Sequence, residues 1–269
     1  MSKTYAVTGV SSGIGASLAG LLKSQGHSVV GFDLVETTTN VDHFVPLDLN
    51  DEEAVLAAAA RCPFGLDGLC NNAGLPPRIG LESAILQVNF LGTRAFTHAM
   101  LDRLNPGASI VNLASRAGHG WRDALEQVKR LGQLTRAEQV PGFVAREGID
   151  ATRCYNLSKE AIILWTASVT EDMIARGFRI NSLSPGGVAT GILEDFKRAF
   201  GEKMARNVER AGRVGSAEEI ASVAAFVLSP QSHWLKGEDI ALDGGMGAFN
   251  MTDALGLDAM TLTSVATPK

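Results

Sequence analysis

Apolar, β-branched runs alternate along this chain with longer segments in which apolar residues recur at helical spacing. The first cycle has an apolar run at residues 4–8, a helical segment at 14–25 and a second apolar run at 27–33. Such alternation is typical of βαβ units and a parallel sheet. We therefore predict an α/β fold, namely a single domain built on a Rossmann-type, doubly wound parallel sheet.

The same pattern continues through most of the chain. Further apolar runs lie at residues 43–47, 68–71, 109–113, 178–183 and 239–242, and we expect about eight strands in all. Helical spacing lies at residues 51–61, 83–104, 155–176 and 216–228. Residues 1–246 thus form one predicted domain, and residues 247–269 a tail in which the sheet pattern has ended.

One segment interrupts this rhythm. Residues 117–152 are rich in Arg, Glu, Gln and Gly, and belong to no βα unit. Their middle, at 123–139, is compatible with a helix. We interpret the segment as a helical insertion before the helix at 155–176.

Composition narrows the class of protein. Hydrophobic residues make up 45% and charged residues 20% of the 269 residues, as in ordinary globular domains. The net charge of -5, without a long basic run, argues against a nucleic-acid partner. We find no secretory-signal pattern and no apolar stretch of membrane-spanning length, so we expect a cytoplasmic protein with no membrane partner.

Cysteine usage points away from disulfides and metals. Cys62, Cys70 and Cys154 are three in number and show no CxxC spacing. Neither a disulfide framework nor a zinc site fits such a set. We interpret all three as packing residues and predict no metal site.

A glycine turn follows the first predicted strand. The sequence TGVSSGIG places Gly9, Gly13 and Gly15 between that strand and the following helix. Glycines let the backbone approach a pyrophosphate closely, and the helix N-terminus offers it free N–H groups. This position favours a phosphate site, although three glycines can also form a tight turn alone.

The second predicted strand ends in an acidic residue. Asp33 lies about twenty residues beyond the glycines, where a carboxylate accepts hydrogen bonds from ribose hydroxyls. It would repel the 2′-phosphate of NADP, and no Arg or Lys follows it directly. NAD is therefore the predicted cofactor, whereas an ordinary turn carboxylate at this position would leave the preference open.

Two further strand ends carry polar residues. Asp48 follows the third strand, where it accepts either from an adenine amino group or, as a helix N-cap, from backbone N–H groups. Asn72, Ala73 and Gly74 follow the fourth strand, at the sheet edge where ligands bind in open α/β folds. The alternative for these three residues is a simple polar turn.

Tyr155 and Lys159 supply candidate chemistry. They lie four residues apart at the start of a predicted helix, so both project from one face. A nearby ammonium favours the phenolate and lowers the pKa of a phenol towards neutrality. A surface pair is the alternative, but the only other tyrosine, Tyr5, lies in the first strand.

Together these motifs resemble those of the short-chain dehydrogenase/reductase family. TGVSSGIG, NNAG, QVNFLG, NLASRAG, YNLSK and SPGGVAT follow one another in the family's order from Thr8 to Thr190. DGG at residues 243–245 is similar to the family's closing strand, so the resemblance covers nearly the whole chain. It implies hydride transfer between NAD and an alcohol or carbonyl carbon.

The resemblance also implies a role for each matched residue. Ser115 hydrogen-bonds the substrate oxygen, and Tyr155 exchanges its proton. Lys159 holds the nicotinamide ribose and lowers the tyrosine pKa, while Asn89 anchors a water relay behind the lysine. The expected cofactor-binding residues are Thr8, Gly9, Ser11, Ser12, Gly13, Ile14, Gly15, Asp33, Asp48, Leu49, Asn72, Ala73, Gly74, Tyr155, Lys159, Pro185, Gly186, Val188 and Thr190, the last at the carboxamide.

The insertion points to one branch of this family. Ser115 and Tyr155 are 40 residues apart (155 minus 115), more than in most members. A comparable insertion occurs in the bacterial 3α-hydroxysteroid dehydrogenase/carbonyl reductase branch and in related coniferyl-alcohol dehydrogenases. The resemblance implies a hydroxysteroid or carbonyl substrate first, and an aryl alcohol next.

Two other classes remain as alternatives. A non-catalytic NAD-binding scaffold normally lacks the Tyr, Lys or Ser that are all present here. An epimerase or dehydratase of the extended branch needs a larger substrate domain than this chain offers. Candidate pocket residues by position, with plain packing as the alternative for each, are Leu75, Pro76, His119, Trp121 and Met246.

Assembly follows from the insertion as well. Many family members form tetramers through the long helices that correspond here to residues 83–104 and 155–176, and the charged insertion would be costly to bury there. We therefore expect a homodimer through residues 216–228 and the last strand. The expected interface stripe consists of Ile220, Val223, Ala224 and Val227.

Overall fold

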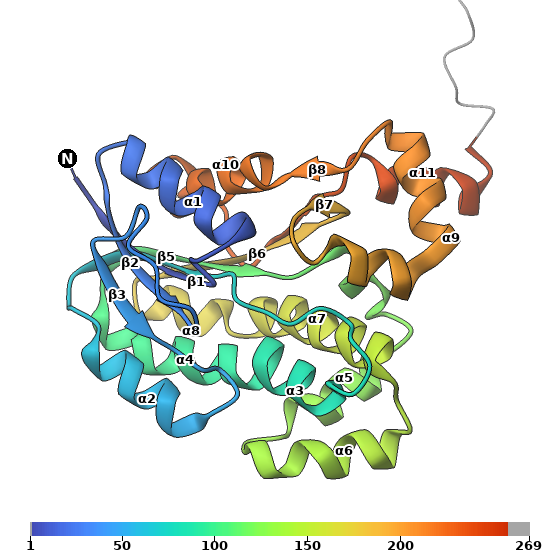
Figure 1. Ribbon diagram of the computed structural model, residues 1–269, viewed down its shortest axis with the longest axis horizontal. Helices are drawn as coiled ribbons and strands as arrows, with labels where there is room; N and C mark the ends of the chain where they lie inside the picture. The colour runs from blue at the N-terminus through green and yellow to red at the C-terminus, as the bar shows by residue number, and fades with distance from the viewer. Residues whose placement is uncertain (1, 258–269) are drawn as a thin grey trace, which may run out of the picture.

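A parallel sheet of seven strands lies between two layers of helices in the computed structural model, which describes residues 2–257 (Figure 1). The strand order is β3-β2-β1-β4-β5-β6-β9, so the chain starts mid-sheet and winds outwards in both directions. The predicted doubly wound fold is confirmed, with seven strands in this sheet instead of about eight. The strands are β1 (Thr4–Thr8), β2 (Ser28–Asp33), β3 (His43–Pro46), β4 (Leu66–Asn71), β5 (Leu104–Leu113), β6 (Arg179–Pro185) and β9 (Asp239–Leu242). A separate two-stranded ribbon pairs β7 (Val188–Ala189) with β8 (Gly215–Ser216).

Helices cover both faces of the sheet. Helices α1 and α10 lie on one face, and α2, α4, α7 and α8 lie on the other (Figure 1). The helices are α1 (Gly13–Ser24), α2 (Glu52–Arg61), α3 (Glu82–Leu86), α4 (Thr93–Met100), α5 (Leu125–Gly132), α6 (Val140–Glu147), α7 (Ala151–Ser168), α8 (Thr170–Ala175), α9 (Leu193–Ala211), α10 (Ala217–Leu228) and α11 (Met246–Leu255). Short 3₁₀ turns occur at Leu101–Arg103, Arg116–Gly120, Ala137–Gln139 and Pro230–Ser232.

The two faces of the sheet bury separate apolar cores. Ile110 of β5 contributes to the core beneath α4 and α7, whereas its neighbour Val111 contributes to the core beneath α1 and α10. Neighbouring strand residues point to opposite faces, and both faces are covered here. This explains why β1, β2 and the end of β5 are nearly continuous apolar runs that were predictable from the sequence.

The predicted helix at residues 83–104 is interrupted. Helices α3 and α4 are separated by a π-helical turn at Gln87–Gly92, and Leu104 already belongs to β5. A Cβ atom on Gly92 would lie 2.1 Å from the carbonyl oxygen of Leu49, so the backbones approach closely at this point. The π turn carries Asn89, one of the predicted site residues.

The helix that carries Tyr155 begins earlier than predicted. Asp150 caps α7 by accepting a 2.7 Å hydrogen bond from the backbone N–H of Arg153. Tyr155 therefore lies in the second turn instead of at the start. The predicted helix to residue 176 is broken at Val169, after which α8 continues.

Two helices fall in segments for which no helix was predicted. The segment after Thr190, for which the sequence analysis predicts no element, contains the long helix α9, which is kinked at Gly201 with φ of +44°. Helix α11 begins at the last residue of the predicted domain and takes up most of residues 247–257 of the predicted tail. The remainder of that tail, 258–269, lies outside the described residues.

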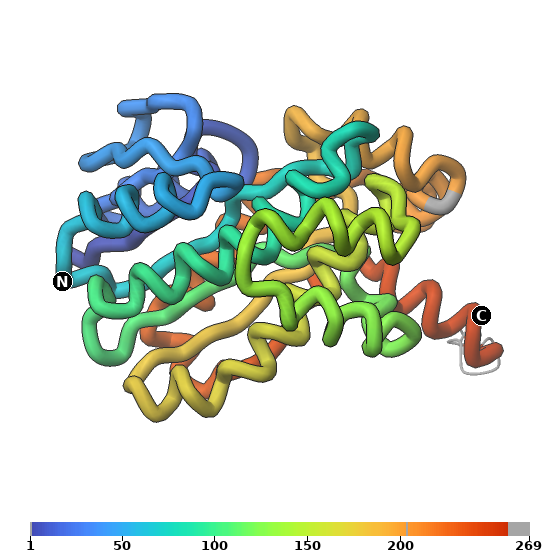
Figure 2. The backbone as a smooth tube through the Cα atoms, turned by 90° about the horizontal axis from the view of Figure 1, so that it is seen from below, coloured from blue at the N-terminus to red at the C-terminus, as the bar shows by residue number. Residues whose placement is uncertain are grey.

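The predicted helical insertion is present as α5 and α6. Figure 2 shows these two helices lying over the layer that contains α3 and α7. Their apolar side chains Val128, Leu131, Val140 and Phe143 are buried in the core on that side. The insertion therefore covers the α3 and α7 part of the helical face through which tetrameric relatives were expected to pair.

The predicted interface stripe on α10 is wrong. Ile220, Ala224 and Val227 are buried in this chain's own core, against α1 and the sheet, and only Val223 is partly exposed. Within and just after α10, Phe226 is 47% exposed and Trp234 is 94% exposed. Helical periodicity alone does not separate a face that packs on its own sheet from a face that meets a partner.

The remaining expectations concern cysteines, membranes and metals. All three cysteines are buried and free, and burial raises the pKa of each thiol to about 12, which agrees with packing roles. Among residues 2–257, no helix is long and apolar enough to cross a bilayer. The same residues contain no cluster of three or more His, Cys, Asp or Glu side chains with metal-ligand placement.

Candidate active site

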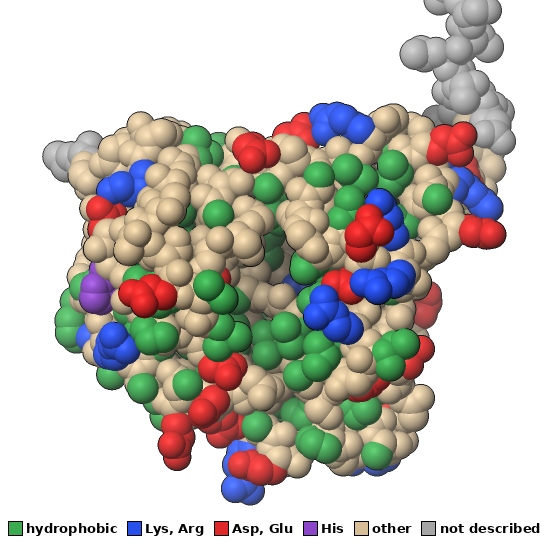
Figure 3. All heavy atoms as spheres, viewed as in Figure 1, with side chains coloured by type: hydrophobic (Ala, Val, Ile, Leu, Met, Phe, Trp, Pro, Cys, Tyr) green, Lys and Arg blue, Asp and Glu red, His purple; other side chains and the backbone are tan. Residues whose placement is uncertain are grey.

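A cavity of about 1230 Å³ opens at the carboxyl ends of the central strands. Its walls come from the glycine turn after β1, the segment after β4, the turn after β5, helix α7 and helix α9. Figure 3 shows the molecule from the side of this hollow, with hydrophobic side chains gathered around it. In open α/β sheets this is the edge at which ligands bind.

The glycine turn has the form of an anion site. Gly9 and Gly13 have φ of +67° and +54°, a region that L side chains rarely adopt. A Cβ atom on Gly15 would lie 2.1 Å from the carbonyl oxygen of Gly9. Ser12, the N-cap of α1, makes no side-chain capping bond, and the first turn has no acidic residue. The N–H groups at the start of α1 therefore remain available to a phosphate.

The segment after β4 is tied to the glycine turn. Thr8 Oγ1 accepts hydrogen bonds from the backbone N–H groups of Asn72 and Ala73, each at 3.0 Å. Asn72 Nδ2 donates in turn to the carbonyl oxygens of Thr8 and Gly9. Asn72, Ala73 and Gly74 line the cavity, whereas Thr8 lies behind them and holds the two strand ends together.

Asp33 has structural partners at the end of β2. Its Oδ2 accepts from the backbone N–H of Ser11 at 3.0 Å, and its Oδ1 accepts from that of Val35 at 3.1 Å. The bond from Ser11 stabilises the glycine turn, and the bond from Val35 closes the turn after β2, so the alternative of an ordinary turn carboxylate also applies to Asp33. It stays partly exposed, so its remaining lone pairs are accessible to a ribose.

Asp48 does not cap a helix. Its Oδ1 accepts from the backbone N–H of Asn50 at 2.8 Å, and the N-cap of α2 is Asp51. The alternative role of Asp48 as an N-cap is therefore wrong. Five of the predicted cofactor-binding residues lie outside the lining of the cavity. They are Asp33 at the end of β2, Asp48 and Leu49 after β3, and Ser11 and Gly15 of the glycine turn.

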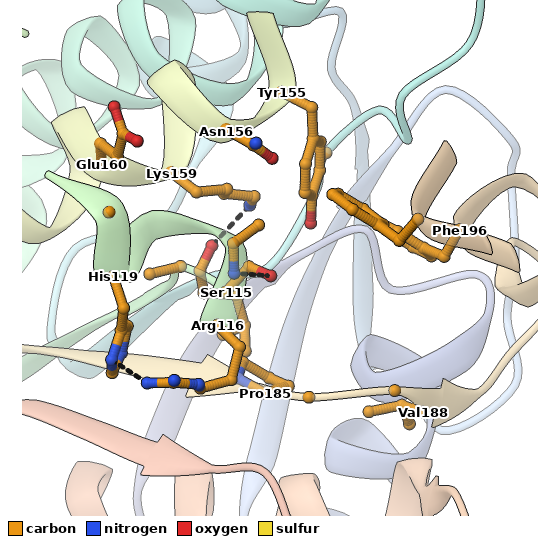
Figure 4. Close-up of a pocket in the computed structure, with 18 of the residues that line it drawn as sticks. Ser115, Arg116, His119, Tyr155, Asn156, Lys159, Glu160, Pro185, Val188 and Phe196 are labelled. Carbon is orange, nitrogen blue, oxygen red and sulfur yellow. Dashed lines mark hydrogen bonds between the residues drawn. The ribbon is translucent and has the colours of Figure 1, made fainter. Parts of the chain in front are cut away.

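Three predicted catalytic side chains meet in the cavity (Figure 4). Ser115 follows β5 and begins the 3₁₀ turn, with its Oγ accepting from the backbone N–H of Ala117. Tyr155 and Lys159 reach the same space from α7. The hydroxyl of Tyr155 points towards the Ser115 turn, and Lys159 Nζ lies between that turn and the tyrosine (Figure 4).

Burial dominates the ionisation of this pair. It raises the pKa of Tyr155 to about 12, against a hydrogen bond with Ser115 that lowers it. It also lowers the pKa of Lys159 to about 8, because the ammonium is removed from water. Lys159 Nζ lies 5.8 Å from the centre of the Tyr155 ring. The expected fall of the tyrosine pKa towards neutrality is therefore not found in the protein alone.

Asn89 lies behind the cavity wall, not in it. Its Oδ1 accepts from the backbone N–H of Leu75 at 2.7 Å, and its Nδ2 donates to the carbonyl oxygen of Leu75 at 3.0 Å. The same Nδ2 lies 3.3 Å from Ser158 Oγ. Asn89 thus fixes the segment after β4 next to α7, while the water relay expected of it stays a prediction.

Helix α9 contributes aromatic residues that the sequence analysis missed. The Phe196 ring lies edge-on to that of Tyr155, with 5.2 Å between the ring centres. Phe200 stacks on Phe196 at 6.3 Å. An ion pair of 2.7 Å between Arg78 and Asp195 ties this helix to the segment after β4. The spacing of Phe196 and Phe200, four residues apart, was the available signal.

The other predicted residues divide between cavity and surroundings. The cavity lining includes Pro185, Gly186, Val188 and Thr190 from the segment after β6, as well as Gly9, Ser12, Gly13 and Ile14 from the glycine turn. Among the candidate pocket residues, Leu75, His119 and Met246 line it, whereas Pro76 and Trp121 do not.

A glycine turn at a helix start and a buried Tyr–Lys pair beside Ser115 in one cavity define a nucleotide-dependent oxidoreductase. The short chain dehydrogenase family pattern matches residues 3–124, and the enoyl-(acyl carrier protein) reductase pattern matches residues 140–247. The chain is 36% identical to the coniferyl-alcohol dehydrogenase of Pseudomonas sp. (strain HR199 / DSM 7063), over 91% of this chain and 97% of that one. The chain belongs to the short-chain dehydrogenase/reductase family.

Two further relatives come from the steroid branch. The 3-alpha-hydroxysteroid dehydrogenase/carbonyl reductase of Comamonas testosteroni is 27% identical, over 90% of this chain and 95% of its own. The crystal structure of the 3-alpha-hydroxysteroid dehydrogenase from Pseudomonas sp. B-0831, complexed with NADH, is 28% identical and superposes with a TM-score of 0.79. It covers 97% of this chain and 100% of its own. Its NADH agrees with the predicted cofactor, and the predicted family is confirmed.

Proposed function

We propose that this protein is an NAD-dependent dehydrogenase/reductase that interconverts an alcohol and its carbonyl compound. The observation that carries the proposal is the convergence of Ser115, Tyr155 and Lys159 in the cavity that also contains the glycine turn. A scaffold protein has no need to bury a lysine whose pKa falls to about 8. Proton transfer by a positioned tyrosine does need such an arrangement.

The cofactor fits the residues present. The glycine turn offers free N–H groups without a Cβ atom in the way, and Asp33 lies beyond it for the adenosine ribose. The nicotinamide end is assigned to the cavity wall that contains Pro185, Gly186, Val188 and Thr190. When bound, oxidised NAD supplies the hydride acceptor and a positive charge.

Each catalytic side chain then has one task. Ser115 donates a hydrogen bond to the substrate oxygen and holds it beside Tyr155. Tyr155 as phenolate takes the hydroxyl proton, and in the reverse direction its hydroxyl returns that proton. Lys159 keeps a positive charge near the phenolate. Because burial raises the pKa of Tyr155 in the protein alone, positive charge in the cavity has to stabilise the phenolate.

Aryl alcohols are the first substrate class and hydroxysteroids the second, the reverse of the order that the sequence motifs favoured. The stacked Phe196 and Phe200 beside the tyrosine offer a flat aromatic wall, which suits a planar ring. The identity of 36% to a coniferyl-alcohol dehydrogenase, against 27% to a hydroxysteroid dehydrogenase, supports the same order. The cavity of about 1230 Å³ keeps steroids as the second class.

A substrate screen tests this proposal. Purified protein is mixed with NAD and, separately, with coniferyl-type aryl alcohols, alicyclic alcohols and 3α-hydroxysteroids, and NADH formation is followed by absorbance. We expect turnover with at least one class, fastest with aryl alcohols. NAD binding without turnover of any alcohol or carbonyl compound would favour the scaffold alternative.

For assembly, we propose a homodimer built on the edge strand β9 and the end of α10. Phe226 near the end of α10 and Trp234 just before β9 expose large apolar surfaces, whereas the insertion packs on α3 and α7. Light scattering should give a dimer for wild type and a monomer for Trp234→Ser with Phe226→Ser. A wild-type tetramer, or a dimer that survives both changes, contradicts the assignment.

Three further expectations stay predictions. They are the residue roles assigned above, the domain boundary at residue 246 and the cytoplasmic location.

A further inference from the structure

A chain of polar side chains ties the Ser115 turn to the last strand of the sheet. His119 Nε2 lies 2.9 Å from Asp239 Oδ2, and His119 Nδ1 is hydrogen-bonded to an Arg116 guanidinium nitrogen (Figure 4). Arg116 Nε pairs with Asp243 at 2.9 Å. These groups lie outside the Ser–Tyr–Lys set, and no task in the proposed reaction uses them.

Asp239 lies at one end of this network of side chains. Desolvation by burial raises the pKa of its carboxyl, but hydrogen bonds with His119, Ser182 and Ser184 outweigh that effect and hold the pKa below its usual value. The Ser182 hydroxyl donates at 2.6 Å and the Ser184 hydroxyl at 2.8 Å to Oδ1. The carboxylate is therefore ionised at neutral pH and only accepts hydrogen bonds.

The partners of His119 fix its protonation. A guanidinium only donates, so Nδ1 of His119 has to accept from Arg116. Asp239 only accepts, so Nε2 of His119 has to carry the hydrogen. These two partners assign a hydrogen to Nε2 and the accepting lone pair to Nδ1. A hydrogen on Nδ1 would face the Arg116 donor and break that link.

We propose that His119 is a positioning residue for Ser115, acting as the neutral Nε2–H tautomer between Arg116 and Asp239. The inference rests on the proposed function, because Ser115 is taken to hold the substrate oxygen. Arg116 follows Ser115 directly, and His119 lies in the same 3₁₀ turn, Arg116–Gly120. Two side chains of one turn are therefore fastened to β9 and to the loop after it.

Asp243, the other end of this network of side chains, is connected to the cavity as well. Asp243 accepts from the backbone N–H groups of Gly245 and Gly247, which flank Met246 in the cavity wall. The network thus sets the position of the Ser115 turn relative to the segment around Met246, which lines the same cavity. A displacement of about 1 Å in such a turn is enough to slow catalysis by roughly 10²-fold.

Three point variants of the protein test whether His119 affects kcat. His119→Phe keeps the ring size but removes both hydrogen bonds, and should lower kcat roughly tenfold to 10²-fold with KM for NAD unchanged. His119→Gln retains one donor and one acceptor and should recover most of kcat. His43→Gln, at an exposed histidine in β3, is the matched control and should equal wild type. Equal kcat in His119→Phe and wild type would overturn the proposal.

Nitrogen NMR tests the tautomer without any turnover. Protein labelled with ¹⁵N-histidine contains five histidines, and the spectrum of His119→Gln identifies the signals of His119 by difference. We expect a protonated Nε2 and an unprotonated Nδ1 at neutral pH. A hydrogen on Nδ1 would overturn the proposal. This test uses the wild-type protein, so it decides even where His119→Phe fails to fold. Lack of turnover with every alcohol would refute the proposed function but leave this tautomer result standing.

Discussion

The ammonium of Lys159 donates a hydrogen bond of 2.7 Å to the backbone carbonyl of Leu113, which ties helix α7 to the end of strand β5. Ser115 lies two residues beyond Leu113, so this bond also fixes Tyr155 relative to Ser115. The lysine is 6% exposed, and burial lowers the pKa of its ammonium to about 8. A charge held at such a cost in stability is typical of functional sites.

Lys159→Met should therefore stabilise the fold while it abolishes turnover. The folded pKa lies below the unfolded value near 10.4, so the charged lysine destabilises the folded state below about pH 8. The lost bond to Leu113 offsets part of the gain, which leaves a net stabilisation of about 1 kcal/mol at pH 7. Urea unfolding at pH 7 measures it.

The difference in unfolding free energy between Lys159→Met and wild type should depend on pH. As pH rises from about 8 to about 10.4, wild-type Lys159 loses its proton in the folded state, and the advantage of the variant should shrink. Lys129→Met, at an exposed lysine paired with Glu126, is the control and should show no such trend. A Lys159→Met protein that is less stable than wild type at every pH contradicts the expectation.

Tyr155→Phe should lower kcat by about 10²- to 10⁴-fold, because the group that transfers the proton has gone. The ring that packs on Phe196 is kept, so the melting temperature and the affinity for NAD should stay near wild type. Steady-state kinetics and fluorescence titration with NAD check both parts. Tyr5→Phe, at the other tyrosine of the chain, should retain full activity. Turnover that survives in Tyr155→Phe removes the tyrosine from the mechanism.

Cofactor choice should depend on Asp33. The double change Asp33→Asn with Leu34→Arg removes the carboxylate, adds a cation at a residue that is 69% exposed, and leaves an acceptor for Ser11. We expect kcat/KM to fall with NAD and to rise with NADP, as measured side by side. Leu34→Arg alone should shift the ratio less. A wild-type preference for NADP would refute the role given to Asp33.

The strands and the catalytic group were predictable because each leaves a local signal in the sequence. Strands β1, β2 and the end of β5 are buried on both faces and form apolar runs, and the spacing of Tyr155 and Lys159 survives any change in the loops. The ionisation of this pair was not predictable in the same way. Spacing shows which charge lies near Tyr155, whereas the dominant effect on its pKa is the depth of burial.

Helix α9 left a weaker signal. Its apolar side chains Phe196, Phe200 and Met204 line the cavity, the two phenylalanines are only partly buried against the core, and most of its other residues are charged or small. The sequence therefore lacks the broad apolar stripe of a core helix. On α10 the stripe was present, but it was assigned to a partner although Ile220, Ala224 and Val227 pack on this chain's own sheet.

The aromatic wall on α9 leads to the last prediction. Phe196→Leu keeps an apolar side chain but removes the flat surface beside Tyr155. An aromatic pair contributes about 0.5–1.5 kcal/mol beyond apolar burial, so kcat/KM for aryl alcohols should fall roughly 2- to 12-fold. Alicyclic alcohols gain nothing from stacking and should change less. Phe64→Leu, at an exposed phenylalanine after α2, is the control. An equal fall for both classes of alcohol would mean that Phe196 only fills space, and the preference for planar substrates would need another source in the cavity.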